Sequence, residues 1–133
     1  MFKIGFLDNN HMQLIFDENI MYLYNLSNFL DWKFLVTLVT KIDWLINSNG
    51  PISVYNIDMP FHHSRIEYLS VVKSNEEVIF NLYSKHIAEP KYNLIQQSII
   101  TGNEVVKLGD EINHLRKILI PSLNNKEEKE NVK

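Results

Sequence analysis

The feature that most constrains this fold is one long amphipathic helix, predicted over residues 28–47. Its apolar positions recur at alternating intervals of three and four residues, at Trp32, Leu35, Val39, Ile42 and Ile46. This spacing gathers the side chains on one helical face. Ser27 can cap the start of the helix, and Gly50-Pro51 can end it. Because a helix with one apolar stripe must bury that stripe, the rest of the chain has to supply a partner surface.

The segments on both sides of this helix have the alternating apolar pattern of strands. Asp- and Asn-rich turn sequences separate the first of them. The pattern predicts strands over residues 2–6, 11–16, 20–26 and, after the helix, 52–58. Residues 20–26 also fit the beginning of the helix, so their sequence leaves strand and helix both open.

A β-hairpin is predicted over residues 64–84, because two apolar segments flank a short polar turn. We expect Ser74 and Asn75 to form the two-residue turn. In this register Leu69, Val71, Val78 and Phe80 share one face of the hairpin. A shift by one residue would place Lys73 opposite Val78, so we prefer the first register.

A second hairpin is predicted over residues 96–108. Gly102 and Asn103 supply its turn, because both residue types tolerate positive φ angles. In this interpretation EVVKL, residues 104–108, is the returning strand. The segment over residues 91–97 could be helical instead, and the sequence does not decide between the two.

A short helix and a polar tail complete the chain. Asp110 can cap a helix over residues 111–119, and Pro121 ends it. The charged segment over residues 124–133 is expected to be disordered. The predicted order is therefore β-β-β-α-β-β-β-β-β-α, with short turns that indicate a mostly antiparallel sheet. We predict a single two-layer α+β domain over residues 1–123, with the long helix packed on the sheet and a short C-terminal helix.

Composition excludes several classes of function. The 133 residues include no cysteine, which rules out thiol nucleophiles, disulfide scaffolds and zinc ribbons. The four glycines are isolated from one another, so no dinucleotide-binding or P-loop motif is present. The net charge of −3, without a basic run, argues against nucleic-acid binding. No apolar stretch is long enough for a membrane span or a signal-peptide core. We expect a soluble cytoplasmic protein without a cofactor.

The segment DMPFHHSRIEY, residues 58–68, holds the densest group of reactive side chains. Its adjacent histidines diverge on a strand or helix, so we expect no metal site. His63, Arg65 and Glu67 could form a small hydrolase or nuclease site. More simply, the segment is a polar edge that contacts a partner, and its candidate contact residues are Asp58, His62, His63, Arg65 and Glu67.

Partner binding is the function that the sequence favours. Trp44 falls in the polar stripe of the long helix, where it either joins an interface or lies under a loop or the C-terminal helix. Glu76 and Glu77 could steer a basic partner. We expect a protein-binding protein without catalysis, best interpreted as a bacterial immunity protein that blocks a basic toxin domain. The alternatives are the enzyme and a subunit or adaptor of a larger assembly, which could self-associate as a homo-oligomer through a sheet edge.

Overall fold

The computed structural model describes the backbone of residues 2–59 and 64–131, and their side chains up to residue 120. In chain order the elements are β1 (Lys3–Asp8), β2 (His11–Asp17), β3 (Ile20–Asn25), α1 (Phe29–Ile46), β4 (Ile52–Asp58), β5 (Arg65–Ser74), β6 (Glu77–His86), β7 (Asn93–Thr101) and α2 (Asn103–Asn131). The predicted α+β class is confirmed, and both segments that the sequence left open are strands.

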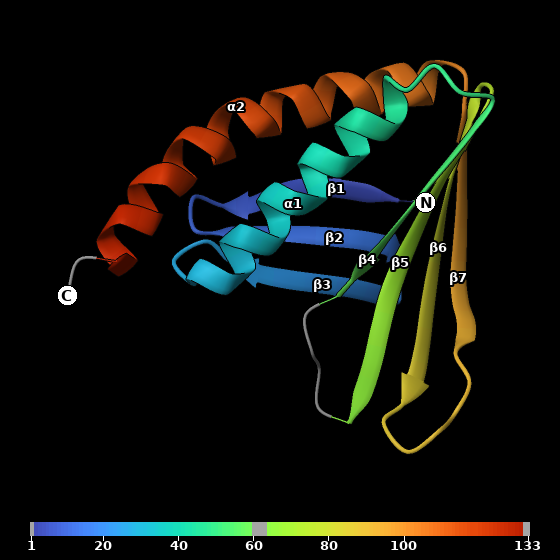
Figure 1. Cartoon of the computed structure of the whole chain (residues 1–133), viewed down its shortest axis with the longest axis horizontal. Coiled ribbons are helices and arrows are strands. Elements are labelled where there is room, and N and C mark those ends of the chain that lie inside the picture. The colour runs from blue at the N-terminus through green and yellow to red at the C-terminus, as the bar shows by residue number, and fades with distance from the viewer. Residues whose placement is uncertain (1, 60–63, 132–133) are drawn as a thin grey trace.

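The strands form two antiparallel sheets, not one. The three-stranded sheet has the order β1-β2-β3, and the four-stranded sheet has the order β4-β5-β6-β7. Helix α1 crosses the three-stranded sheet, α2 lies along α1, and the four-stranded sheet stands to one side (Figure 1). We call the face of each sheet that carries its buried residues the inner face, and the opposite face the outer face.

The inner faces of the two sheets meet around Phe2. Its ring stacks on that of Phe80 in β6, with the ring centroids 3.8 Å apart. Its backbone N–H donates a hydrogen bond of 2.8 Å to Oγ of Ser98 in β7. The rings of Phe16 and Tyr22 extend this aromatic group within the three-stranded sheet, with an edge-to-face contact. One continuous core therefore joins the two sheets and α1.

Helix α1 buries the predicted apolar stripe, with Leu35 and Val39 fully enclosed. Its N-cap is Asn28 and not the expected Ser27, because the Asn28 side chain accepts hydrogen bonds from the backbone N–H groups of Leu30 and Asp31. The two helices are joined by polar contacts as well as by apolar packing. Neither helix, over its described residues, is long and apolar enough to cross a membrane.

The predicted β5–β6 hairpin is present, but its turn lies one residue further along the chain, which shifts the strand pairing by two residues. Its turn is Asn75-Glu76, and Asn75 has the positive φ of 55° that such turns favour. Lys73 therefore lies opposite Val78, the pairing that the sequence argument rejected. Its ammonium group is not left among the apolar residues of the inner face, because Nζ donates a 2.6 Å hydrogen bond to the carbonyl of Ser48. The four apolar residues predicted to share a face do so, and all are buried.

The predicted strand over residues 104–108 is wrong, and the C-terminal helix is long instead of short. Gly102 has the expected positive φ of 56°, but it leads into α2 and not into a hairpin. The buried face of α2 continues one apolar spacing of three and four residues: Val105, Leu108, Ile112, Leu115 and Leu119. Pro121 does not end this helix, which runs on to Asn131. The domain boundary at residue 123 stays a prediction.

Candidate functional site

Arg65 and Glu67 share one face of β5, and that face is the inner one. Oε2 of Glu67 accepts a hydrogen bond from the hydroxyl of Tyr22 in β3. Nε of Arg65 donates a 2.9 Å hydrogen bond to Oγ of Ser84, which is fully buried in β6. Burial, and after it the hydrogen bond with Glu67, raises the pKa of Tyr22. Both predicted site residues are thus already bonded to side chains from other strands.

The remaining predicted contact residues lie apart from one another. Trp44 is 57% exposed on α1, so no helix or loop of the described chain encloses it. Asp58 is exposed at the end of β4, whereas Glu76 and Glu77 are exposed at the β5–β6 turn. These positions do not form one cluster. The other two predicted contact residues, His62 and His63, lie outside the residues that the structure describes.

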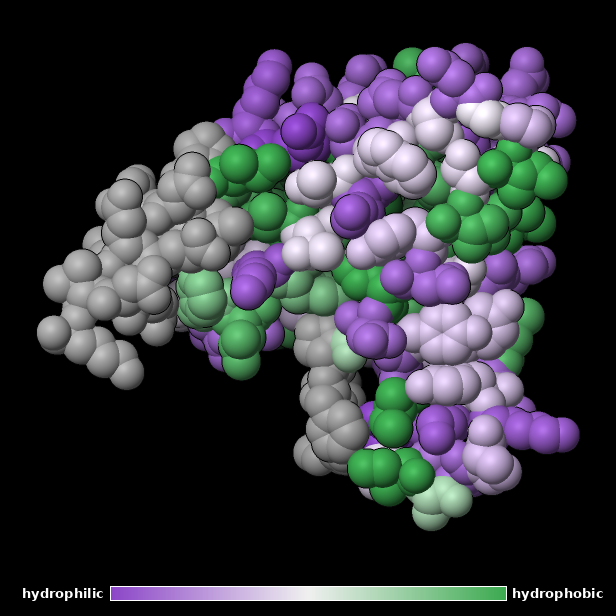
Figure 2. Space-filling view, viewed as in Figure 1, coloured by the Kyte–Doolittle hydropathy of each residue, from purple (hydrophilic) through white to green (hydrophobic). Residues whose placement is uncertain are grey.

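A row of apolar side chains crosses the outer face of the four-stranded sheet. Strand pairing places one member in each strand: Val54, Val72, Ile79 and Ile99. The two members in the edge strands are the most open, with Val54 53% and Ile99 51% exposed. Figure 2 shows hydrophobic residues gathered over this sheet near the β5–β6 turn. We call these four residues the apolar row.

An acidic turn borders the apolar row. Glu77 lies two residues before Ile79 on the same face of β6, and Glu76 precedes it in the turn. Ser74, Asn75 and Thr101 join the two glutamates around an open hollow of about 660 Å³. We call Glu76 and Glu77 the acidic tip. An uncharged apolar surface therefore ends beside two exposed carboxylates.

The outer face becomes polar and then aromatic with increasing distance from this turn. Nε2 of Gln97 donates a 2.8 Å hydrogen bond to Oδ1 of Asn81 in the middle of the sheet. Beyond them the rings of Tyr68 and Tyr83 stack across the strands at 4.7 Å, and Tyr92 meets Tyr68 edge to face. Loss of water contact raises the pKa of Tyr68, and the two neighbouring tyrosines raise it further. The three tyrosine rings contact one another, so they leave less surface free for a partner than the apolar row does.

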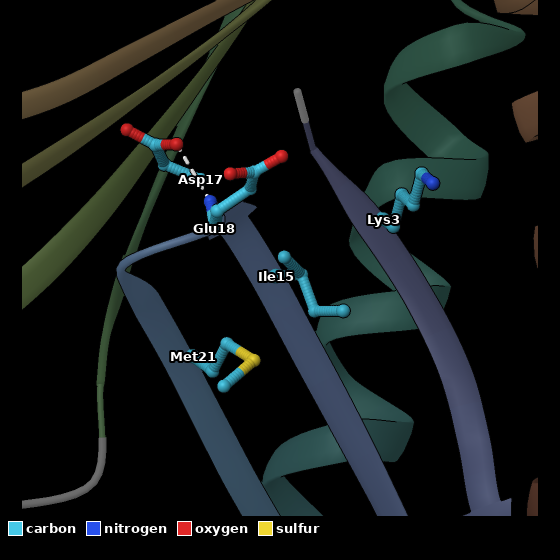
Figure 3. A pocket seen from close by; sticks show the side chains of 5 residues that line it. All are labelled: Lys3, Ile15, Asp17, Glu18 and Met21. Carbon is cyan, nitrogen blue, oxygen red and sulfur yellow. Dashed lines mark hydrogen bonds between the residues drawn. The ribbon is translucent and has the colours of Figure 1, made fainter.

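A second hollow lies on the outer face of the three-stranded sheet. Its volume is about 490 Å³, and its lining residues are Lys3, Ile15, Asp17, Glu18 and Met21. Figure 3 shows the Ile15 side chain between Lys3 on one side and Met21 on the other, with the carboxylates of Asp17 and Glu18 at the end of the hollow nearest the β2–β3 turn. Oδ1 of Asp17 accepts a 2.6 Å hydrogen bond from the backbone N–H of Glu18. Because both signs of charge line this hollow, it does not select a cation over an anion.

The apolar row is the surface that the sequence argument missed. Its signal was present, because each member alternates with residues of the buried inner face, such as Val71 and Phe80. Apolar residues on both faces of a strand indicate that something covers both faces. Among the residues that the structure describes, no helix lies over the outer face of the four-stranded sheet (Figure 1). Within the described parts of the chain, no three histidine, aspartate or glutamate side chains are grouped as a metal site requires.

The geometry therefore provides one open surface with an apolar centre and an acidic border, and a separate internal network around Glu67. The chain was compared with models of protein families, with curated proteins and with solved structures. None of the three comparisons finds a match.

Proposed function

We propose that this chain is a small protein-binding protein without catalytic activity, and that it binds through the apolar row and the acidic tip. The observation that carries this proposal is the open row of Val54, Val72, Ile79 and Ile99 beside Glu76 and Glu77. A surface with an apolar centre and a charged border is typical of protein interfaces. Rows of this kind on a monomeric surface usually mark interaction sites.

The acidic tip beside the apolar row determines which charge the partner should carry. Near the acidic tip the nearest lysine on the strands, Lys73, is turned to the inner face and bonded to Ser48. The carboxylates of Glu76 and Glu77 are thus not neutralised by that cation. They would attract lysine or arginine side chains and speed the encounter with a basic partner. The partner we propose has an apolar contact patch with basic residues at one side.

Within this class we propose a bacterial, cytoplasmic immunity protein that neutralises a basic toxin domain by steric blocking. Such a protein needs a rigid scaffold and one complementary surface, and it needs no chemistry of its own. The four-stranded sheet supplies the rigidity, since its inner face is packed on the core shared with α1 and the other sheet. Occupation of the toxin's active site or substrate groove would be sufficient for inhibition.

A small hydrolase or nuclease centred on His63, Arg65 and Glu67 is the alternative. Two contacts favour binding over this alternative. Arg65 is bonded to Ser84 and Glu67 to Tyr22, so both side chains already serve the packing of the strands. A catalytic acid or base has to be free to reach a substrate proton.

The proposal is tested by expressing the product of the neighbouring gene in a bacterial host, with and without this chain. We expect that product to arrest growth and the chain to relieve the arrest. Val54→Lys should weaken binding of the purified pair by about tenfold or more, because it places a charge in the apolar centre. Reversal of both glutamates, Glu76→Lys with Glu77→Lys, should mainly slow association and reduce its dependence on salt.

Met21→Lys is the matched control, because Met21 is an exposed apolar residue on a strand of the other sheet. It should leave rescue and affinity unchanged. Thermal unfolding of each variant separates loss of binding from loss of the fold. A neighbouring product without toxicity, or rescue by Val54→Lys equal to that of the unaltered chain, would contradict the proposal.

A further inference from the structure

Strand β7 is a long, uncharged edge strand of the four-stranded sheet. The four edge strands are β1, β3, β4 and β7, and β7 is the longest, with nine residues against six, six and seven. Its sequence, NLIQQSIIT, has no charged residue and no proline. Proteins normally protect such edges with charges, prolines, bulges or a short strand length. Charged residues are present in β1 and β4, and β3 is short.

The regular part of β7 has unused backbone hydrogen-bonding capacity. A register shift between Leu82 and Tyr83 of β6 disturbs only the first residues of β7, so residues 96–101 are regularly paired. Along the described chain, these residues make no backbone hydrogen bond beyond the ladder with β6. One carbonyl, that of Gln97, accepts a 3.3 Å hydrogen bond from Nε2 of Gln96. The other backbone groups on that side are available to another strand.

We propose that β7 pairs antiparallel with β7 of a second copy of this chain, about a two-fold axis at Ile99. Residues related by this axis then lie opposite each other: Ile99 opposite Ile99 of the second copy, and Gln97 opposite Thr101 of the second copy. No charged side chain faces another charged side chain in this pairing, because β7 has none. An isologous contact requires such self-complementarity, because each side presents the same residues.

The register also accounts for the exposure of Ile99. In a single chain this side chain is 51% exposed at the end of the apolar row. In the pair it meets its own copy, and the row continues from Val54 of one chain to Val54 of the other. Ser98 and Ile100 point to the inner face and are already buried in the chain's own core, so they contribute backbone groups alone. The pairing ends before Gly102 turns the chain into α2.

This inference does not rest on the proposed function. Edge pairing adds strands beside the sheet and leaves its outer face uncovered, so Val54, Val72, Ile79 and the acidic tip remain available to a different partner. The two contacts can also be separated by substitution. Val54 lies in the row but far from the β7 edge, whereas Ile99 lies at that edge.

Engineered thiols test the register directly, because the chain has no cysteine. Ile99→Cys places two thiols opposite each other, at a separation that a disulfide can span. Under mild oxidation we expect a cross-linked species of twice the 15.7 kDa chain mass. It should form about tenfold faster than with Val54→Cys, whose exposure is nearly the same. Equal rates for the two variants would overturn the proposal.

Sedimentation over a concentration series tests the pairing without a cross-link. We expect the unaltered chain to show a monomer–dimer equilibrium. Ile99→Lys and Ile99→Glu should each weaken it by about tenfold, because like charges meet at the axis. An equimolar mixture of the two variants should restore pairing, and Val54→Lys should leave it unchanged. A chain that is monomeric at every concentration, or an Ile99→Lys variant that pairs as well as the unaltered chain, would overturn the proposal.

Discussion

The hydroxyl of Tyr22 on β3 donates a hydrogen bond to Oε2 of Glu67 on β5, and this bond ties the three-stranded sheet to the four-stranded sheet. The two residues are 45 positions apart in the chain. Their contact lies in a partly buried region, where a hydrogen bond to a carboxylate contributes more than on the surface.

Tyr22→Phe removes this hydrogen bond and leaves the ring in place. We expect the free energy of unfolding to fall by about 1–2 kcal/mol, because the Glu67 carboxylate loses a donor while it stays partly buried. Urea unfolding measures the change. Tyr83→Phe is the control, since the Tyr83 ring stacks on the open outer face and its hydroxyl has no hydrogen bond within the described residues. A loss from Tyr83→Phe as large as that from Tyr22→Phe would contradict this role of the bond.

Tyr24→Phe should have the opposite effect. Tyr24 lies two residues along the same face of β3 and is 4% exposed, yet its hydroxyl has no hydrogen-bond partner in the described part of the chain. Removal of a buried, unpaired hydroxyl should raise the free energy of unfolding by about 0.5–1 kcal/mol. The same urea titration tests this, and a destabilised Tyr24→Phe variant would show that the hydroxyl has a partner.

Alkaline pH should destabilise the fold through these two tyrosines. Burial raises the pKa of both Tyr22 and Tyr24 above the ordinary value of about 10. The unfolded chain therefore loses these protons at a lower pH than the folded chain. The stability that they contribute is complete below about pH 10 and is lost as the pH rises toward their folded-state pKa values. Melting temperatures between neutral and strongly alkaline pH should decline less steeply in the double Tyr22→Phe, Tyr24→Phe variant. If the melting temperatures of the unaltered chain and the double variant decline in parallel with pH, the two tyrosines do not cause the loss of stability at alkaline pH.

Two glycines should respond oppositely to alanine. Gly102 has a positive φ of 56° and open space around it, so Gly102→Ala should destabilise by about 1 kcal/mol through its backbone alone. Gly109 is inside α2, where an added Cβ would meet Cγ2 of Ile46 at an ordinary 3.9 Å. Gly109→Ala should therefore stabilise by about 0.5–1 kcal/mol. Thermal unfolding of the two variants measures both changes in stability. A change of the same sign in Gly102→Ala and Gly109→Ala would refute the assignment of Gly102 to the turn.

Lys73→Met tests the hydrogen bond that Lys73 makes near the end of the β5–β6 hairpin. The substitution keeps an extended apolar side chain but removes the hydrogen bond from Nζ to the Ser48 carbonyl. We expect a loss of about 1 kcal/mol, because the carbonyl loses a charged donor. Lys33→Met, at an exposed position of α1, should change stability by less than about 0.5 kcal/mol. Equal effects would show that the hydrogen bond from Lys73 to Ser48 does not contribute to stability.

The hairpin register shows where sequence reasoning fails in this chain. The argument against Lys73 opposite Val78 assumed that the two side chains would see only each other. The loop after α1 supplies an acceptor at Ser48, which is distant in the sequence from either strand. Cross-strand rules describe pairs, and they contain no information about a third segment that folds over the pair.

The error in α2 has a different origin. Gly102 was correctly predicted to have a positive φ, but a glycine with that geometry ends a strand as readily as it turns a hairpin. The spacing from Val105 to Leu119 already favoured one continuous helix. The turn signal of Gly102 and Asn103 outweighed it in the prediction. Tertiary packing on α1 decides the outcome, because Leu108 and Ile112 are buried there.

The site was less predictable than the fold. Helix geometry put Trp44 in the polar stripe of α1 but left open whether another segment covers it, and strand alternation puts Arg65 and Glu67 on one face of β5. This face is the inner one because of how the two sheets pack together, and no local sequence pattern predicts that packing. The apolar row needs the pairing of four strands before it exists as a row at all.

The position of Phe2 has a consequence for synthesis. Its backbone N–H binds Ser98, 96 residues later, and its ring stacks on Phe80. The first strand therefore cannot reach its final surroundings until most of the chain has left the ribosome. Contacts of such high sequence separation slow folding, and the nascent N-terminal meander must stay unaggregated with its apolar face open during that interval. We therefore expect the first 26 residues to be the part of this chain that depends most on protection by chaperones.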